Sequence, residues 1–251
     1  MNRETVLKVK KYLTDNSLLD DETFDSLPEK RKKGKIFTFN EHVEGMIYSL
    51  LSAQTKFSVI EKNRENINKL FFYYNTDEIL SRNYEYFLNG LQDLKCGSRV
   101  RKAQMKVLHY NIELMRTIEN EYGSMDTFVT SKPVKNIIQM LSSPSSKYKM
   151  KQMSTALVCE YLKNVGIDCA KPDVHMKRML GCNRLGWSKH SNATNDEVYD
   201  AFRFLSEETG MYMADIDYFF WLYCSDGNAE ICSAAPNCKN CVIKDECNNN
   251  K

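Results

Sequence analysis

Four cysteines near the end of the sequence have a spacing that suits metal chemistry. They follow the pattern C-x5-C-x2-C-x5-C and are Cys232, Cys238, Cys241 and Cys247. Four thiolates on so short a segment can surround one metal centre, and Pro236 favours a loop over a helix between them. The set suits a [4Fe–4S] cluster, with structural zinc as the alternative and disulfides or free thiols as a third possibility.

Composition limits the classes of protein to which the chain can belong. Of its 251 residues 42% are hydrophobic, so it can bury a core, and its formal charge of +2 does not by itself mark a nucleic-acid binder. The first residues are charged throughout, unlike a signal peptide, and no apolar run approaches the roughly 20 residues that span a bilayer. We expect an intracellular, cytoplasmic (nucleoid-associated) protein that is not secreted and has no membrane contact.

Helices are the elements expected to position the functional residues. Gly and Pro are few, at 10 and 5, and apolar residues recur at i, i+3 and i+4 without strand-like alternation. The patterns predict helices at 3–15, 40–52, 57–72, within 76–93, after Ser98, at 133–141, 150–166, 173–180, 195–208 and 211–224. Asn40 is the expected N-cap of the second helix.

Two basic segments allow two interpretations each. The run 30–35 is either a solvated loop or a phosphate contact. Lys147, Lys149 and Lys151 form either a solvated basic turn or a second contact to phosphate.

Several segments resemble, in order along the chain, the helix-hairpin-helix DNA glycosylases. The cysteine spacing is similar to the C-x6-C-x2-C-x5-C loop of the endonuclease III family, with one residue fewer in the first gap. Residues 50–55 resemble that family's L-L-S-A-Q-A/T, and Lys102-Ala103 resembles its S-K-A. Residues 171–178 resemble V-D-T-H-I-x-R and are closer still to the D-V-H-M of 8-oxoguanine glycosylases.

The resemblance assigns roles to three residues. Asp173 matches the catalytic aspartate; its residue type alone suggests a helix N-cap, and the two roles are compatible. Gln54 matches the glutamine that enters the gap left by an extruded base, although alone it would be an ordinary polar helix end. His175 is expected on the DNA side of the same helix as Asp173, the alternative being a surface or packed histidine.

The hairpin is where the sequence departs from the family. The family reads L-P-G-V-G-x-K-T-A, and its glycines let backbone amides approach a phosphate, but the matching stretch 148–156 has no glycine. Thr155-Ala156 matches T-A, which puts Ser154 at the position of the lyase lysine; an offset of two or three residues would instead bring Lys151 to the site. The residues expected to contact DNA in this stretch are Lys149, Lys151, Gln152 and Ser154.

Tyr48 and Ser49, which precede Gln54 in the sequence, are candidates for lining a base pocket. The family's adenine-specific branch carries a glutamate where this sequence has Ser49, which argues against that branch. Ser49 and its neighbour Tyr48 are therefore expected to line a pocket for another base, with a core position as the alternative for Tyr48.

The resemblance implies an all-α fold of two helical domains with a DNA-binding cleft between them and a C-terminal [4Fe–4S] loop. We predict a six-helix domain with the hairpin at 36–167, and a second domain from 1–35 and 168–251 that carries the loop 232–247.

The implied function is base-excision repair of double-stranded DNA by a monomer that hydrolyses the N-glycosidic bond of a flipped, damaged or mispaired base. Serine at 154 predicts a monofunctional glycosylase, because serine cannot form a Schiff base. The alternatives are a bifunctional glycosylase/AP lyase using a nearby lysine, a non-catalytic iron–sulfur DNA-binding relative, and a zinc-stabilised helical interaction protein.

Overall fold

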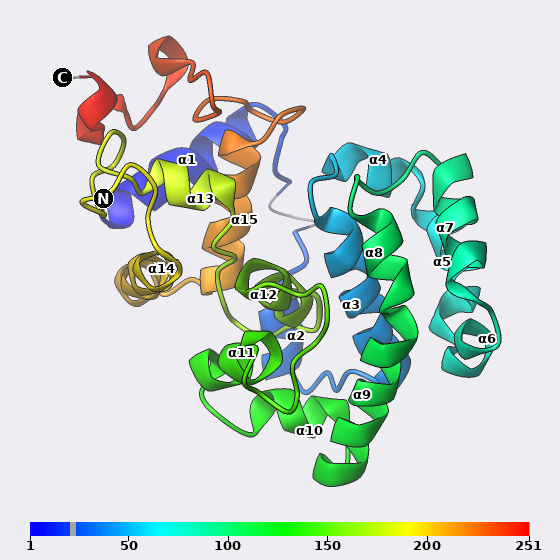
Figure 1. Ribbon diagram of the computed structural model, residues 1–251. Helices are drawn as coiled ribbons and strands as arrows, with labels where there is room; N and C mark the ends of the chain where they lie inside the picture. The colour runs from blue at the N-terminus through cyan, green and yellow to red at the C-terminus, as the bar shows by residue number, and fades with distance from the viewer. Residues whose placement is uncertain (21–23, 251) are drawn as a thin grey trace. The chain divides into compact units, whose positions relative to one another are not determined.

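Helices make up the regular structure of the protein. The computed structural model describes residues 1–20 and 24–250, and its regular elements over these ranges are α-helices and short 3-10 helices (Figure 1). This confirms the all-α prediction. The chain divides into two compact units: unit 1 is Met1–Pro28 with Asp168–Lys251, and unit 2 is Glu29–Ile167. Across the described ranges, no helix is both long enough and apolar enough to cross a membrane.

Over its described residues, unit 1 consists of four complete α-helices around an apolar core. These are α1 (Arg3–Asp15), α13 (Val174–Met179), α14 (Asn195–Thr209) and α15 (Met213–Cys224). The helices α1, α14 and α15 pack on one another, and α13 packs on α14 and α15. Leu13, Phe202 and Phe220 are fully buried among them. The chain then continues through the 3-10 turns η2 (Cys238–Asn240), η3 (Lys244–Glu246) and η4 (Asn248–Asn250).

Unit 2 is organised around α3 (Phe39–Ser52), which is buried along most of its length. This helix packs on α12 (Thr155–Asn164), α10 (Met125–Thr130), α4 (Phe57–Lys62) and η1 (Phe72–Tyr74). The other helices are α5 (Arg64–Leu70), α6 (Thr76–Leu80), α7 (Tyr84–Asp93), α8 (Arg101–Lys106), α9 (Leu108–Tyr122) and α11 (Val134–Ser142), and α2 (Leu27–Lys32) spans the junction of the units.

Several predicted helix boundaries are wrong in detail. Thr38, not Asn40, caps α3, because Thr38 and Glu41 form a reciprocal capping box. Non-helical residues at Asn63 and Val107 each split a predicted long helix into two. The helix expected from 150 begins only at Thr155, because the residues before it form a turn.

Unit 2 differs from the predicted domain 36–167 in two details. Unit 2 contains ten α-helices, α3 to α12, instead of six, partly because of these splits. It begins at Glu29 instead of residue 36. The contacts of Arg31 agree with this boundary, since its guanidinium donates hydrogen bonds to Asp126 and to the Val165 carbonyl, both within unit 2.

Candidate functional site

The end of α3 presents Gln54 on the surface of unit 2. The helix ends at Ser52, as the sequence predicted, and Gln54 follows in a left-handed conformation with φ of 57°. That conformation costs a non-glycine residue about 1 kcal/mol. The side chain is exposed, and its Oε1 accepts a hydrogen bond from Nε of Arg99 at 3.2 Å. The surrounding structure thus holds Gln54 in one defined position.

Tyr48 and Ser49 contact different elements of unit 2. Ser49 is fully buried and donates a hydrogen bond to the Leu157 carbonyl of α12 at 2.5 Å. Tyr48 is half-buried, and its hydroxyl donates to Oδ1 of Asn68 at 2.8 Å while Arg64 lies over its ring. Burial raises the pKa of the Tyr48 phenol. Both hydroxyls have partners, and their role as base-pocket residues stays a prediction.

The segment between α11 and α12 forms a tight turn without glycine. The Met150 amide donates to the Leu141 carbonyl at 3.0 Å, which ties the middle of the segment to the last turn of α11. Gln152 has a φ of 59°, and its position matches a glycine of the hairpin motif. Asn111 of α9 clamps the turn: its Oδ1 accepts from the Lys151 amide at 2.8 Å and its Nδ2 donates to the Lys151 carbonyl at 3.0 Å.

Two lysines of this turn already have partners within unit 2. Lys149 donates from Nζ to the Met153 carbonyl, and burial lowers the pKa of its ammonium. The Lys151 ammonium lies 3.6 Å from the ring centroid of Tyr110, a cation–π contact. DNA contact by either lysine stays a prediction, although the exposed side chain of Lys151 is accessible.

Ser154 is the N-cap of α12. Its Oγ accepts a hydrogen bond from the Leu157 amide at 3.5 Å. The first turn of the helix, 155–158, contains no lysine. The serine therefore has a structural role at the start of the hairpin's second helix.

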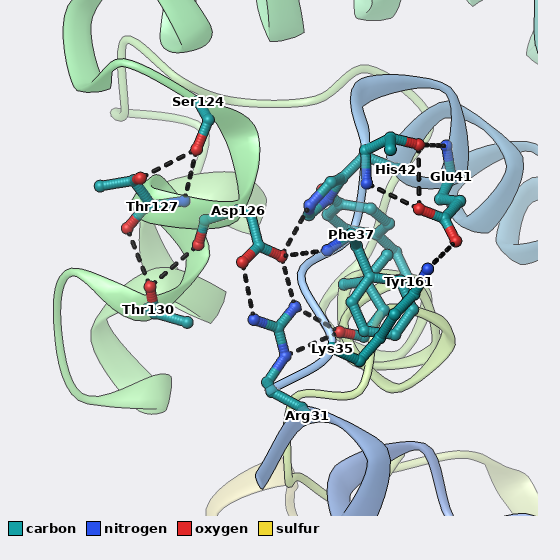
Figure 2. A network of polar contacts seen from close by, with 12 residues as sticks. Arg31, Lys35, Phe37, Glu41, His42, Ser124, Asp126, Thr127, Thr130 and Tyr161 are labelled. Carbon is teal, nitrogen blue, oxygen red and sulfur yellow. Dashed lines mark hydrogen bonds and ion pairs between the residues drawn. The ribbon is translucent and has the colours of Figure 1, made fainter. Parts of the chain in front are cut away.

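A buried polar network that the sequence did not predict joins the start of α3 to α10 and α12 (Figure 2). Asp126 of α10 accepts two hydrogen bonds from the Arg31 guanidinium, at 2.7 and 3.0 Å, and one from the Phe37 amide at 3.2 Å. The fully buried His42 lies with Nε2 3.4 Å from Asp126 and with Nδ1 2.7 Å from the Tyr161 hydroxyl.

The charges in this network are set by burial and by pairing. Burial tends to raise the pKa of Asp126, but hydrogen bonds from His42 and Arg31 outweigh it and hold that pKa well below its usual range. Burial lowers the pKa of His42, which favours the neutral imidazole. Arg31 is thus neither a solvated residue nor a phosphate contact, since its head group is occupied inside unit 2.

Asp173 caps α13 in unit 1, in agreement with its residue type. Its Oδ1 accepts hydrogen bonds from the amides of His175 at 2.9 Å and Met176 at 3.1 Å. Its Oδ2 accepts none from the described residues. His175 is half-buried, and its Nδ1 accepts from Nη2 of Arg178 at 3.2 Å. Burial lowers the pKa of His175, and the nearby Asp173 carboxylate opposes this shift.

The cysteine loop 232–247 is attached to both α13 and α15. Arg178 donates from Nη2 to the Cys232 carbonyl at 3.0 Å. The Tyr223 hydroxyl donates to Sγ of Cys241 at 3.4 Å and accepts from the Val242 amide at 3.0 Å. Arg178 therefore links the loop to the helix that Asp173 caps.

The cysteine loop has suitable donors for a four-thiolate centre. None of its cysteines is in a disulfide, and burial together with the neighbouring thiols raises the pKa of Cys241 and Cys247. Over residues 1–20 and 24–250, however, no group of three or more His, Cys, Asp or Glu side chains is arranged to hold a metal ion. The metal centre therefore stays a prediction that rests on the donor set and its spacing.

The site residues expected from the sequence fall into two groups. Asp173 and His175 lie together at the start of α13 in unit 1. Gln54 and the hairpin residues belong to unit 2, where their helices α3 and α12 pack on each other. Sequence patterns did not predict the structural roles of Asn111 and Gln104. Their side-chain amides contact Lys151 and Leu50, which lie far away in the sequence.

The fold is similar to that of a solved glycosylase. No protein-family model matches the sequence, and no curated protein matches it. The structure matches a crystal structure of Methanocaldococcus jannaschii 8-oxoguanine glycosylase/lyase in complex with 15mer DNA containing 8-oxoguanine, with a TM-score of 0.60 and 18% sequence identity. The match covers 89% of this chain and 97% of that chain. The match confirms the predicted all-helical, glycosylase-like fold. The predicted cleft between two domains and the [4Fe–4S] loop stay predictions.

Proposed function

We propose that the protein is a DNA glycosylase of base-excision repair, acting on a damaged base turned out of double-stranded DNA. The observation that carries the proposal is the Asp173 carboxylate at the N-terminus of α13. It stands in a segment whose sequence resembles the one that holds the family's catalytic aspartate. The chain that presents it has the fold of a glycosylase/lyase solved with DNA containing 8-oxoguanine. The proposal therefore rests on a glycosylase-like fold and on the Asp173 carboxylate, which the amides of His175 and Met176 orient.

The reaction needs a fixed carboxylate beside the sugar of the flipped base. When the N-glycosidic bond breaks, its electron pair leaves with the base and positive charge develops at C1′. In the proposed reaction the Asp173 carboxylate stabilises that charge and accepts a proton from the attacking water. Two backbone amides hold Oδ1, which leaves Oδ2 to face the reacting atoms. The proton taken from water then passes, directly or through solvent, to the departing base. The products are the free base and an abasic site.

The other site residues would prepare the DNA for this step. Gln54 would enter the gap left by the flipped base, because its side chain is exposed at the end of α3. His175 would contact the distorted backbone as a neutral imidazole, since burial lowers its pKa. The turn 149–154 would contact phosphate through Lys151, Gln152 and Ser154, which are exposed.

The proposed reaction is monofunctional. A lyase step needs an amine that forms a Schiff base with the sugar. Ser154 has no amine and its hydroxyl caps α12, and the first turn of that helix has no lysine.

One observation favours a second candidate reaction, a glycosylase/lyase that uses Lys149. Burial lowers the pKa of this ammonium, which increases the fraction of free amine. Borohydride trapping of a covalent protein–DNA adduct separates the two reactions. An adduct that disappears in Lys149→Ala but persists in Lys151→Ala would establish a lyase that uses Lys149. The reverse pattern would establish a lyase that uses Lys151, and no adduct in the wild type supports the monofunctional enzyme.

The proposal includes a [4Fe–4S] cluster held by Cys232, Cys238, Cys241 and Cys247, with zinc as the alternative. A bound centre would fix the loop and, through Arg178, the helix that carries Asp173. Anaerobically purified protein should be brown and absorb at about 400 nm if it holds the cluster. A colourless protein with one zinc ion would replace the cluster by zinc and leave the hydrolytic step unchanged.

The decisive experiment is an excision assay over duplexes that contain uracil, alkylated purines, oxidised bases or hypoxanthine. We expect release of at least one base, and a loss of about 100-fold or more in Asp173→Asn. Asparagine caps a helix as well as aspartate does, so this variant should keep its thermal stability. If the wild type releases no base from the panel but binds the duplexes, the protein is a non-catalytic DNA-binding relative.

A further inference from the structure

Two side chains of the segment 99–104 hold the end of α3 at two points. Arg99 donates from Nε to Oε1 of Gln54 at 3.2 Å. Gln104, on α8, donates from Nε2 to the Leu50 carbonyl at 2.7 Å. One contact fixes the side chain of Gln54, and the other fixes the last turn of the helix from which Gln54 extends.

The contact of Gln104 is made at full burial. Only 1% of its surface is exposed, and among the described residues its Oε1 has no hydrogen-bond partner. Burying an amide oxygen without a hydrogen-bond partner is unfavourable. The hydrogen bond from the amide nitrogen of Gln104 has to offset this cost. The Leu50 carbonyl accepts from both Gln104 and the Ala53 amide, which leaves the final turn of α3 little freedom.

The backbone is strained on both sides of the Arg99–Gln54 contact. Gln54 has a φ of 57°, and Lys95, shortly before Arg99, has a φ of 54°. Non-glycine residues keep such conformations only where the surrounding structure holds them, and they concentrate at functional sites. Lys95 lies just after α7 in this conformation, which lets the amide of the buried Cys96 donate to the Leu91 carbonyl at 2.8 Å. Gln54, by contrast, follows α3 as an exposed residue.

We propose that Arg99 and Gln104 are positioning residues that keep Gln54 ready to enter the gap in the DNA. The inference rests on the proposed function, in which Gln54 fills that gap. Arg99 orients the amide of Gln54 in the free protein, so less side-chain freedom is lost when the amide enters the duplex. Gln104 fixes the end of α3 in the position from which the Gln54 side chain would reach the gap in the DNA.

The test compares binding to two duplexes by fluorescence anisotropy. One contains a tetrahydrofuran abasic analogue, which presents the gap without any base to excise, and the other is undamaged. We expect Arg99→Ala to weaken binding to the analogue duplex about threefold to tenfold more than binding to the undamaged duplex. Arg99→Lys should show the same selective loss, because lysine keeps the charge but not the planar donor.

Charge loss is controlled by Arg82→Ala, which removes an arginine that lies over Phe72 and Tyr86 in the same unit. If this variant weakens DNA binding at all, it should weaken binding to the two duplexes equally. In a Gln54→Ala background, Arg99→Ala should lose its selective effect, because it acts through Gln54. Equal weakening of both duplexes by Arg99→Ala in the presence of Gln54 would make Arg99 a phosphate contact and overturn the proposal.

Gln104→Met keeps the bulk of the side chain and removes its donor. We expect the same selective loss of binding in this variant. If it fails to fold, the exposed Arg99 variants still decide the question. Failure of the proposed function is distinguished by the excision assay, in which the wild type would release no base. The anisotropy assay would still report whether Arg99 acts through Gln54.

Discussion

At Asp173 the requirements of helix formation and of catalysis fall on one carboxylate. The helix needs an acceptor for the amides of His175 and Met176, and Oδ1 supplies it. The reaction would need a negative charge beside the sugar, which only the ionised aspartate supplies. Asparagine meets the first requirement and not the second, and for this reason the Asp173→Asn variant isolates the chemistry from the fold.

Gln152 shows the opposite case, a residue poorly suited to its own backbone. It adopts a φ of 59°, whereas the motif it resembles has glycine there. We expect Gln152→Gly to stabilise the protein by about 0.5–1 kcal/mol, because glycine adopts this conformation without steric cost. Urea unfolding measures the change.

Gln139→Gly is the matched control for that prediction. Gln139 is exposed within α11, where glycine should cost about 1 kcal/mol. If both substitutions destabilise the protein equally, the turn does not strain Gln152.

Among the elements, α3 and α12 depend most closely on each other. A Cβ atom at Gly45 would lie 3.2 Å from Cβ of Asn164 and 3.3 Å from Cγ1 of Val165. Asn164 also donates from Nδ2 to the Gly45 carbonyl at 3.0 Å. The helix that precedes Gln54 and the second helix of the hairpin are therefore packed closely together at a glycine.

This close approach predicts that larger residues at position 45 are destabilising in order of size. Gly45→Ala should be neutral or slightly destabilising, and Gly45→Leu should cost about 2 kcal/mol or more in urea unfolding. Helix propensity alone makes the opposite prediction for alanine, a gain of about 1 kcal/mol. A clear stabilisation by alanine would therefore contradict the tight packing of α3 on α12.

Sequence patterns predicted most elements because their signals are local. Residue type placed the N-cap at Asp173 and the end of α3 near Ser52, since both depend on neighbours within a turn. The start of α12 was missed, because Met150 and Met153 continue an apolar stripe although they lie in the turn. The contacts of Arg31 and Asn111 with residues far along the chain have no local signal.

For the molecule as a whole, the formal charge of +2 says little about its response to acid. The buried pair of His42 and Asp126 matters more. The pKa of His42 is lowered in the folded protein, so the unfolded chain binds more protons as the pH falls through about 6.5. The pKa of Asp126 is also lowered, so its contribution is lost at lower pH, below about 4.

We therefore expect the free energy of unfolding to fall between about pH 7 and pH 5, and to fall further below about pH 4. Urea unfolding across this range measures both steps. The variant His42→Gln should flatten the first step and Asp126→Asn the second, although the latter will also cost about 3 kcal/mol at neutral pH by leaving Arg31 unpaired. An unchanged slope in His42→Gln would show that other groups cause the first step.

The clamp of Asn111 on the hairpin turn implies an order of events during folding. The Lys151 amide and carbonyl are both satisfied by a side chain of α9, a helix that ends well before the turn in the sequence. Because Gln152 and not glycine adopts the positive φ, the turn 150–153 is unfavourable by itself. It becomes stable once α9 is in place and Asn111 binds the Lys151 backbone. We therefore expect the hairpin turn to form after α9 during folding, and its amides to exchange with deuterium sooner than those of α3.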